Sequence, residues 1–274
     1  MHTPISTRKD SLQRMYQSHD LLILPERFLK IRALLSQSHA DARALARIVE
    51  TDIMIAASLL KIANSSVYNP MNKPLASISK AIARLGLATS AQISMSMSLF
   101  QDIHLPIALQ HLRQFWAHSF AVSQLCLRMC EQLKPNVVDD ADMLFMAGLF
   151  HDIGNILIVL HIDAAYFEQD FLECHGAELC DLEQQVYGLN HAEVGKIMLQ
   201  QWSLPEALIE IVACHHHPEN NVSAAICSSA DQFTHQHWEG LQYIEAVQSK
   251  VHELSSNDMR EWMATSDILC PLLK

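Results

Sequence analysis

The chain has 274 residues, half of them hydrophobic, and a formal net charge of −11 with histidine neutral. Such an acidic chain lacks the cationic surface that nucleic acids and anionic membranes require, which argues against both as partners. Its seven cysteines are scattered and form no Cys-x-x-Cys pair, so we expect reduced, buried thiols and a cytoplasmic protein. The sequence has no signal-peptide core and no run of about 18 uninterrupted apolar residues, so no membrane span is expected.

The composition favours an all-α protein. Only 7 residues are glycine, while Ala, Leu, Ile and Met are abundant, and these four include the strongest helix formers. The length gives room for one large domain or for two closely packed subdomains with a substantial core.

Short helices are predicted to fill the first hundred residues. Apolar residues recur at helical spacing between polar breaks, which predicts helices over 25–35, 42–50, 53–63, 78–85 and 91–100. Thr51-Asp52 is placed to cap the third helix and Ser77 the fourth, and Gly86 is placed to end the fourth in the left-handed conformation. Short helices joined by tight turns are typical of helix-turn-helix arrays. Exposed Arg and Lys are too few for DNA, however, so a compact packing module is the favoured interpretation.

Three segments of this half carry a family resemblance: 45–52, 59–65 and 77–86. The most specific are "LLKIANS" and "SISKAIARLG", and together with Leu24-Pro25 they resemble the HDOD family over roughly residues 20–235. The resemblance implies a multi-helix HDOD fold with an N-terminal helical subdomain over 1–105, an HD-like metal-binding subdomain over 106–235 and a helical tail over 236–274. It also implies a role in bacterial signal transduction.

The second half is predicted to form longer helices. A long amphipathic helix begins at Pro106 and ends before Lys134, and another is predicted to start at Asp163. Asn190 and Glu193 have the spacing of a capping box, which places His191 in the first turn of its helix. The next helix along the chain is predicted to have Asp139, Asp140 and Asp142 at its N-terminus and to lead into His151-Asp152. Further helices are predicted over 177–187, 205–214 and 224–233.

His151 and Asp152 lie side by side between two apolar runs, 143–147 and 156–160. Burying an unpaired carboxylate is costly, so Asp152 needs a cation, a hydrogen-bond network or access to water. A bound metal would satisfy both residues at once. The alternative is structural, with His151 packed or capping and Asp152 accepting hydrogen bonds at a helix boundary.

Seven polar residues lie on or beside apolar helices in this half: His118, His151, Asp152, His191, His215, His216 and Asp231. Imidazoles and carboxylates together suit Fe, Mn or Zn better than Ca. One ion held by His151, Asp152, Asp231 and a histidine of another helix would keep positions free for water. A second ion would use Asp152 as a bridge. Metal-bound water can attack a phosphoester, so Asp152 is the candidate catalytic residue.

The order His…His-Asp…His…His-His…Asp resembles the HD superfamily of metal-dependent phosphohydrolases, especially its HD-GYP branch. His118 then matches the first family histidine and His151-Asp152 the name-giving pair. His191 matches the next histidine, His215-His216 the histidine pair and Asp231 the final aspartate, although a shift of one place would bring in His217. Two departures argue against hydrolysis of cyclic dinucleotides: Asn155 replaces the lysine of His-Asp-x-Gly-Lys, and no Gly-Tyr-Pro motif follows.

Three functional interpretations follow. The leading one is an HDOD regulatory protein that acts through a signalling protein partner or a small phosphorylated ligand, with one or two divalent ions in a structural role. The rival is a metal-dependent phosphohydrolase, which the full ligand set favours and Asn155 disfavours. A weaker third is a redox or oxygen sensor with a histidine-rich iron site. The sequence does not define the ligand or the oligomeric state.

Overall fold

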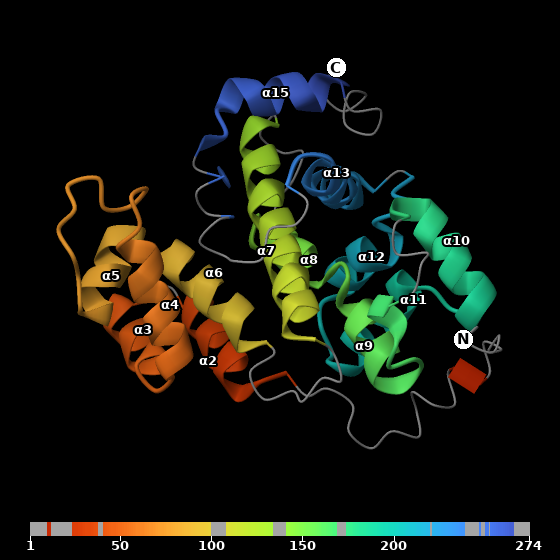
Figure 1. Ribbon diagram of the computed structural model, residues 1–274, viewed down its shortest axis with the longest axis horizontal. Coiled ribbons are helices and arrows are strands. Elements are labelled where there is room, and N and C mark those ends of the chain that lie inside the picture. Colours follow the sequence, from red (N-terminus) through yellow and green to blue (C-terminus); the bar gives the residue numbers. More distant parts are fainter. Residues whose placement is uncertain are drawn as a thin grey trace. The chain divides into compact units, whose positions relative to one another are not determined.

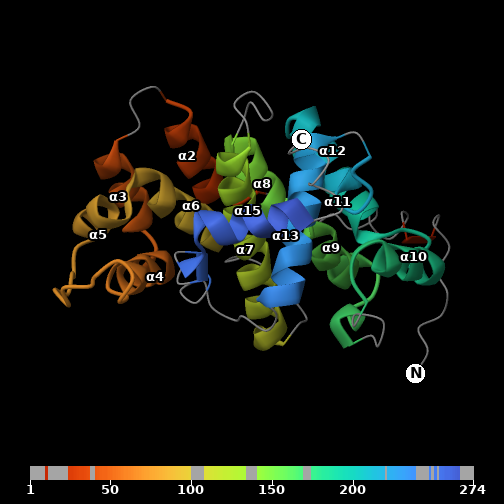
Figure 2. The ribbon, with the colours of Figure 1, turned by 90° about the horizontal axis from the view of Figure 1, so that it is seen from above.

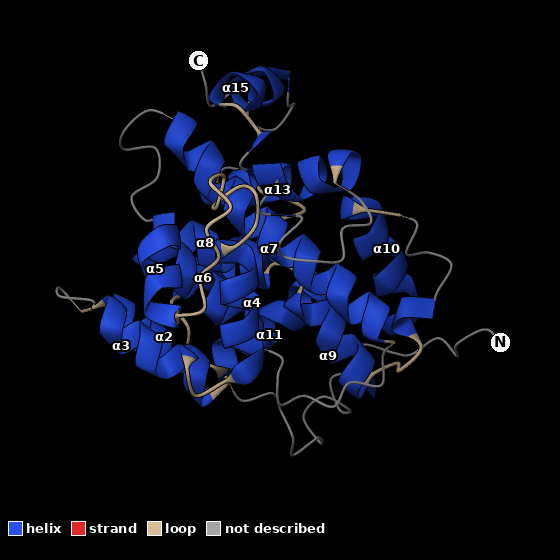
Figure 3. Ribbon diagram, turned by 60° about the vertical axis from the view of Figure 1, so that its left-hand side comes forward, coloured by secondary structure: helices blue, strands red, loops and turns tan. Residues whose placement is uncertain are grey.

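The computed structural model is helical throughout its described part, and no strand occurs among the described residues (Figure 3). These are residues 10–11, 24–37, 41–99, 108–133, 141–168, 174–219, 221–238, 247, 250–251 and 253–265. The predicted all-α class is therefore confirmed. The chain divides into two compact units, one formed by residues 22–104 and the other by 1–21 together with 105–274.

The unit of residues 22–104 consists of five short helices: α2 (Glu26–Leu35), α3 (Ala42–Val49), α4 (Ile53–Ala63), α5 (Ile78–Leu85) and α6 (Leu87–Ser98). Helix α2 packs on α3 and α6, and α4 packs on α5 (Figure 1). The apolar positions that predicted these helices form the core of this unit, with Phe28, Ile31, Leu45, Ile55 and Leu59 fully buried.

The caps of these helices agree with the prediction at Asp52 and differ at Ser77 and Gly86. The Asp52 side chain accepts hydrogen bonds from the backbone N–H of Met54 and Ile55. Ser77 is the N-cap of α5, but its side chain makes no capping hydrogen bond. Gly86 has a positive φ of 87°, yet its ψ of 156° lies outside the left-handed helical region. Gly86 thus ends α5 and directly precedes α6, which begins at Leu87 and not at the predicted position 91.

The second unit is built on the long helix α7 (Leu109–Gln132), which packs against α8 (Ala141–Phe150), α13 (Val222–His237) and α15 (Ser256–Thr265) (Figures 1 and 2). Helix α9 (Ile153–His161) packs on α11 (His191–Gln201), and α11 packs on α12 (Glu206–Cys214) and α10 (Gly176–Tyr187). The predicted helix starting at Asp163 is wrong. Among the described residues, Asp163 is followed by a 3-10 turn, η1 (Tyr166–Glu168), and its side chain accepts hydrogen bonds from the Ala165 N–H and the Tyr187 hydroxyl. Pro106 and Lys134 lie outside the described residues.

Helices α8 and α9 together form a very apolar stretch, Ala141–His161, that by length and composition could cross a membrane. It is 78% buried inside the protein over its most apolar 18-residue window, as expected for core helices. The stretch is also broken in the middle, since α8 ends at Phe150 and α9 begins at Ile153. The break places His151 and Asp152 at a turn inside the hydrophobic core.

Candidate metal centre

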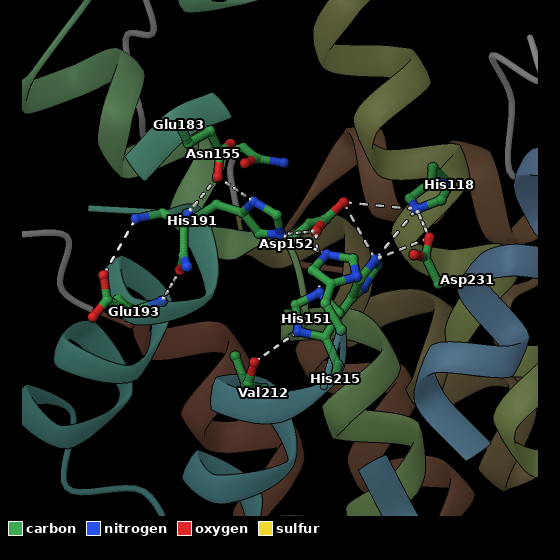
Figure 4. A network of polar contacts seen from close by, with 12 residues as sticks. His118, His151, Asp152, Asn155, Glu183, His191, Glu193, Val212, His215 and Asp231 are labelled. Carbon is green, nitrogen blue, oxygen red and sulfur yellow. Dashed lines mark hydrogen bonds and ion pairs between the residues drawn. The ribbon is translucent and has the colours of Figure 1, made fainter. Parts of the chain in front are cut away.

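Asp152 occupies the N-cap position of α9, but its side chain makes no capping hydrogen bond. Its two carboxylate oxygens face histidines on opposite sides (Figure 4). Oδ2 lies 3.3 Å from Nε2 of His151 and 3.7 Å from Nε2 of His118. Oδ1 lies 3.3 Å from Nε2 of His191 and 3.7 Å from Nε2 of His215. The carboxylate therefore stands between two separate groups of imidazoles.

The first group consists of His118, His151 and Asp152, whose donor atoms all lie within 4.8 Å of one another, and of Asp231, which approaches the two histidines; these residues come from α7, the α8–α9 turn and α13. Nε2 of His118 lies 3.2 Å from Nε2 of His151 and 3.0 Å from Oδ1 of Asp231. The same Asp231 oxygen is 3.6 Å from Nε2 of His151. Four side chains from three segments thus direct their donor atoms at a common region.

The second group consists of Asp152, His191, His215 and His216, whose donor atoms all lie within 4.8 Å of one another. The capping box of Asn190 and Glu193 forms as predicted and sets His191 at the first position of α11. Nε2 of His191 lies 2.9 Å from Nε2 of His216. His191 and His215 are fully buried, so this group lies deep in the unit.

Three of the buried rings have their Nδ1 atoms occupied by oxygen acceptors. Nδ1 of His151 is 2.9 Å from the Gly148 carbonyl oxygen, and Nδ1 of His215 is 2.7 Å from the Val212 carbonyl oxygen. Nδ1 of His191 is 2.7 Å from Oε2 of Glu183. Because a carbonyl or carboxylate oxygen only accepts, each Nδ1 must carry a proton. In the neutral ring, the Nε2 lone pair then faces the centre.

These donor atoms fit a divalent cation. Oδ1 of Asp231 and Nε2 of His215 are buried and have no hydrogen-bond partner, although other polar atoms lie close by. An unsatisfied buried oxygen or nitrogen is costly unless a cation or proton lies against it. Imidazole nitrogens with carboxylate oxygens form the donor set that Fe, Mn and Zn accept. The residues present therefore suit such an ion.

The electrostatics of the centre point the same way. Burial alone would raise the pKa of Asp152, but His151, His215 and His191 outweigh it and hold that pKa well below its usual range. Burial alone would lower the pKa of His191, but Glu183 and then Asp152 outweigh it and raise that pKa to about 9. Glu183 and Asp152 thus favour a proton on the His191 ring, whereas burial lowers the pKa of His118, His215 and His216 and favours their neutral rings. A divalent cation would displace the proton from His191 and bind the neutral rings directly.

His191 contacts a buried carboxylate, Glu183, that the sequence analysis did not select, and Glu183 in turn contacts Tyr166. Glu183 of α10 is fully buried, and its Oε2 accepts from the backbone N–H of His191 at 2.8 Å as well as from its ring. The Tyr166 hydroxyl contacts Oε1 of Glu183 and lies 2.9 Å from Oδ1 of Asn155. Asn155, at the position of the family lysine, is therefore buried and tied to this network, not free to move. A carboxylate on the far side of a histidine ring fixes its orientation for metal binding.

A cavity of about 400 Å³ opens beside the first group. His118, Asp152 and Asn155 form part of its wall, with aromatic side chains on other sides. Three further histidines that the sequence analysis did not select, His111, His175 and His235, also line it. His235 follows Asp231 by four residues on α13, which is the one sequence signal that could have indicated it.

The structure brings all seven residues proposed from the sequence into these two groups. His217, the alternative member of the histidine pair, is exposed and belongs to neither group. The observed pairing is therefore His215 with His216, whose ring centroids lie 3.8 Å apart.

A curated relative, an uncharacterized protein of Treponema pallidum (strain Nichols), is 24% identical over 202 residues. The match covers 72% of this chain but only 38% of the relative, so the chain spans about two fifths of that protein's length.

Several solved structures share the fold. An HDOD domain protein of unknown function from Geobacter sulfurreducens superposes with a TM-score of 0.67 at 21% identity, covering 96% of this chain and 92% of its own. A candidate signal transduction protein of Marinobacter aquaeolei VT8 superposes with a TM-score of 0.64 at 18% identity, covering 97% of this chain and 64% of its own. A candidate phosphohydrolase of Shewanella amazonensis SB2B superposes with a TM-score of 0.62 at 18% identity, covering 93% of this chain and 98% of its own. At these identities the likeness shows the fold.

The family model of the HDOD domain matches residues 21–218, which is most of the chain and includes six of the seven residues of the centre. The chain therefore belongs to the HDOD domain family.

Proposed function

We propose that this HDOD protein acts in signal transduction through a divalent-metal centre that binds a small phosphorylated ligand or organises a surface for a signalling protein partner. The observation that carries the proposal is the position of Asp152, whose two oxygens face two different histidine groups. A carboxylate placed between two sets of imidazoles is the arrangement of a bridging ligand.

Each residue of the centre has a defined part in this proposal. His118, His151 and Asp231 would hold one ion with Oδ2 of Asp152, while His191, His215 and His216 would hold a second with Oδ1. When bound, such ions neutralise phosphate oxygens and lower the pKa of a bound water. The chain's own groups orient these ligands, since Glu183 fixes the His191 ring and the Gly148 and Val212 carbonyls fix His151 and His215.

Phosphoester hydrolysis is a second candidate function. It is favoured by the cavity, because Asp152 and His118 are reachable from a space large enough for a small ligand. It is disfavoured by Asn155, which carries no charge and is buried against Tyr166 where the phosphohydrolases have a lysine. A cationic side chain in a dry site stabilises the charge that develops on a transferring phosphoryl group, and an amide supplies far less of it. Binding without turnover is therefore the expected behaviour.

Elemental analysis of protein purified without a chelator or a histidine tag tests the metal centre. We expect about one or two equivalents of Fe, Mn or Zn, by the ligand count of the two groups. Asp152→Asn keeps the size of the side chain but removes the charge shared by both groups, and should lose most of the metal. His217→Ala is the matched control and should retain it, since His217 is exposed. Wild-type protein that takes up no ion after loading with each metal would overturn the proposal.

A phosphodiester and a phosphomonoester with a chromogenic leaving group separate the two candidate functions in metal-loaded protein. Turnover that disappears in Asp152→Asn supports hydrolysis. Metal-dependent binding of inorganic phosphate without turnover supports the ligand-binding signalling role.

A further inference from the structure

Asp231 has more imidazole neighbours than the two groups require. Its side chain is 6% exposed, and its Oδ1 makes no hydrogen bond in spite of three surrounding ring nitrogens. Two of them, on His118 and His151, belong to the first group. The third is Nε2 of His235, at 3.3 Å from the same oxygen. A buried oxygen approached by three ring nitrogens, with no hydrogen bond to any of them, is the environment of a cation ligand.

His235 is well placed to take part. Nε2 of His118, an oxygen of Asp231 and a ring nitrogen of His235 all lie within 4.8 Å of one another, so the three could contact one ion. The spacing of four residues on α13 brings Asp231 and His235 to the same face of the helix. The ring of His235 stacks on the ring of His175, with centroids 3.9 Å apart and planes 25° apart, which restrains its orientation.

We propose that His235 is an additional ligand of the cation held by His118 and Asp231, and that it draws this ion toward the cavity. The inference rests on the proposed metal centre and extends it to a residue outside the predicted set. His235 lines the cavity together with His118, whereas His191 and His215 of the second group are fully buried. With His235 added, the ion would have five ligands from the protein, namely His118, His151, His235, Asp152 and Asp231. A six-coordinate ion such as Mn²⁺ then keeps one position open for a ligand that enters through the cavity.

The position of this ion matters because of Asn155. The amide at the lysine position is neutral and hydrogen-bonded to Tyr166, so it offers no cation to a phosphate in the cavity. An ion shifted toward His235 would present its positive charge on the cavity side of the centre. The ligand class that fits is an anion with phosphate-type oxygens, small enough for a cavity of about 400 Å³.

Substitutions at His235 test the assignment with Mn²⁺ and Co²⁺ as probes. We expect His235→Ala to lower the affinity for the ion held by His118 and Asp231 by at least about tenfold, measured in competition with a chelator. The visible absorption of the Co²⁺-loaded protein should change as well, because one nitrogen ligand is lost. His235→Gln distinguishes a ligand from a hydrogen-bond donor. Gln retains an N–H that can reach Asp231 but is a poor ligand, so a metal ligand predicts loss in both variants.

His217→Ala is the matched control, since it removes an exposed imidazole that belongs to neither group. It should leave the number of bound ions and the Co²⁺ spectrum close to those of the wild type. Unchanged affinity and spectrum in His235→Ala, or full recovery in His235→Gln, would overturn the inference. Failure of the proposed metal centre is a different result, in which wild-type protein itself takes up no ion.

Discussion

Gly154→Ala tests how the fold holds the two sides of the centre together. Gly154 is the glycine of His151-Asp152-Ile153-Gly154, and it lies where α9 crosses α11. A Cβ at this position would stand 1.9 Å from the carbonyl oxygen of His191 and 2.7 Å from its carbonyl carbon. Both atoms belong to backbone, so no side chain can turn aside to make room. The glycine is required because one metal ligand, Asp152, must lie close to the helix start that carries another, His191.

The magnitude follows from that clash. Nonbonded heavy atoms rest at about 3.5 Å or more, so α9 and α11 would have to separate by roughly 1.6 Å. Overpacking of this kind costs about 1–3 kcal/mol or more, against at most about 1 kcal/mol gained by replacing glycine in a helix. Because the clash is with backbone, the cost should lie at the upper end of this range, about 3 kcal/mol, and we expect a net loss of about 2 kcal/mol, or a fall in melting temperature of about 4–8 °C. The 3.3 Å distance between Asp152 and His191 would be lost, and with it the second ion.

Calorimetry and metal analysis of the same preparations provide the measurement. Gly195→Ala is the control in the same helix contact, because the two nearest neighbours of its Cβ would be side-chain methyl groups, of Val212 at 3.3 Å and Ile153 at 3.5 Å, and the backbone nitrogen of Gly154 would lie at an ordinary contact distance of 3.6 Å. It should shift the melting temperature by no more than a few degrees and keep the metal. A Gly154→Ala protein that melts and binds metal like the wild type would refute the close-contact explanation.

Three other substitutions give further tests. Glu183→Gln leaves an oxygen for the His191 ring but removes the charge, and should weaken metal binding about 10- to 100-fold. The control is Tyr166→Phe, which keeps the carboxylate and should lose less metal affinity. Equal losses of affinity in the two variants would contradict the role of the charge. His216→Ala should weaken the second ion in chelator competition while His217→Ala should not, and the reverse result would shift the histidine pair by one place. Asn155→Lys places a cation in the cavity wall and should therefore raise phosphoester turnover by the metal-loaded protein, measured with a chromogenic phosphodiester. Unchanged turnover would indicate that the missing charge is not what limits hydrolysis.

The parts of the fold that could be predicted were those governed by local rules. Apolar spacing identified the short helices, and a side chain one residue before a helix identified the caps at Asp52 and Asn190. The prediction that Asp163 starts an α-helix was wrong, because only a 3-10 turn follows among the described residues, although the Asp163 side chain does accept the Ala165 N–H locally. Its carboxylate is also bonded by the hydroxyl of Tyr187, from a helix 24 residues later, and no local pattern contains that contact.

The candidate metal centre likewise contains residues that a local sequence motif identifies and residues that only the folded structure identifies. Residues in the order of a known motif could be selected from the sequence, because a motif fixes identity and spacing. Glu183 and His235 could not, because neither belongs to that motif and each acts through a contact made by the fold. Glu183 reaches His191 across the turn between α10 and α11, and His235 reaches the centre only because α13 packs beside α7.

Asp152 itself departs from a local rule in a way that supports a function. Asp52, Asn190 and Asn221 each hold an N-cap position and accept a backbone hydrogen bond there. Asp152 holds the same position at α9 and accepts none, although such a bond is worth about 1 kcal/mol. Natural sequences tend to give up local stability at functional sites. The Asp152 backbone, with φ −100° and ψ 9°, also differs from the extended conformation of those three capping residues. The carboxylate without a cap is the one that faces both histidine groups, so its orientation fits the proposed metal centre better than a role as a helix cap.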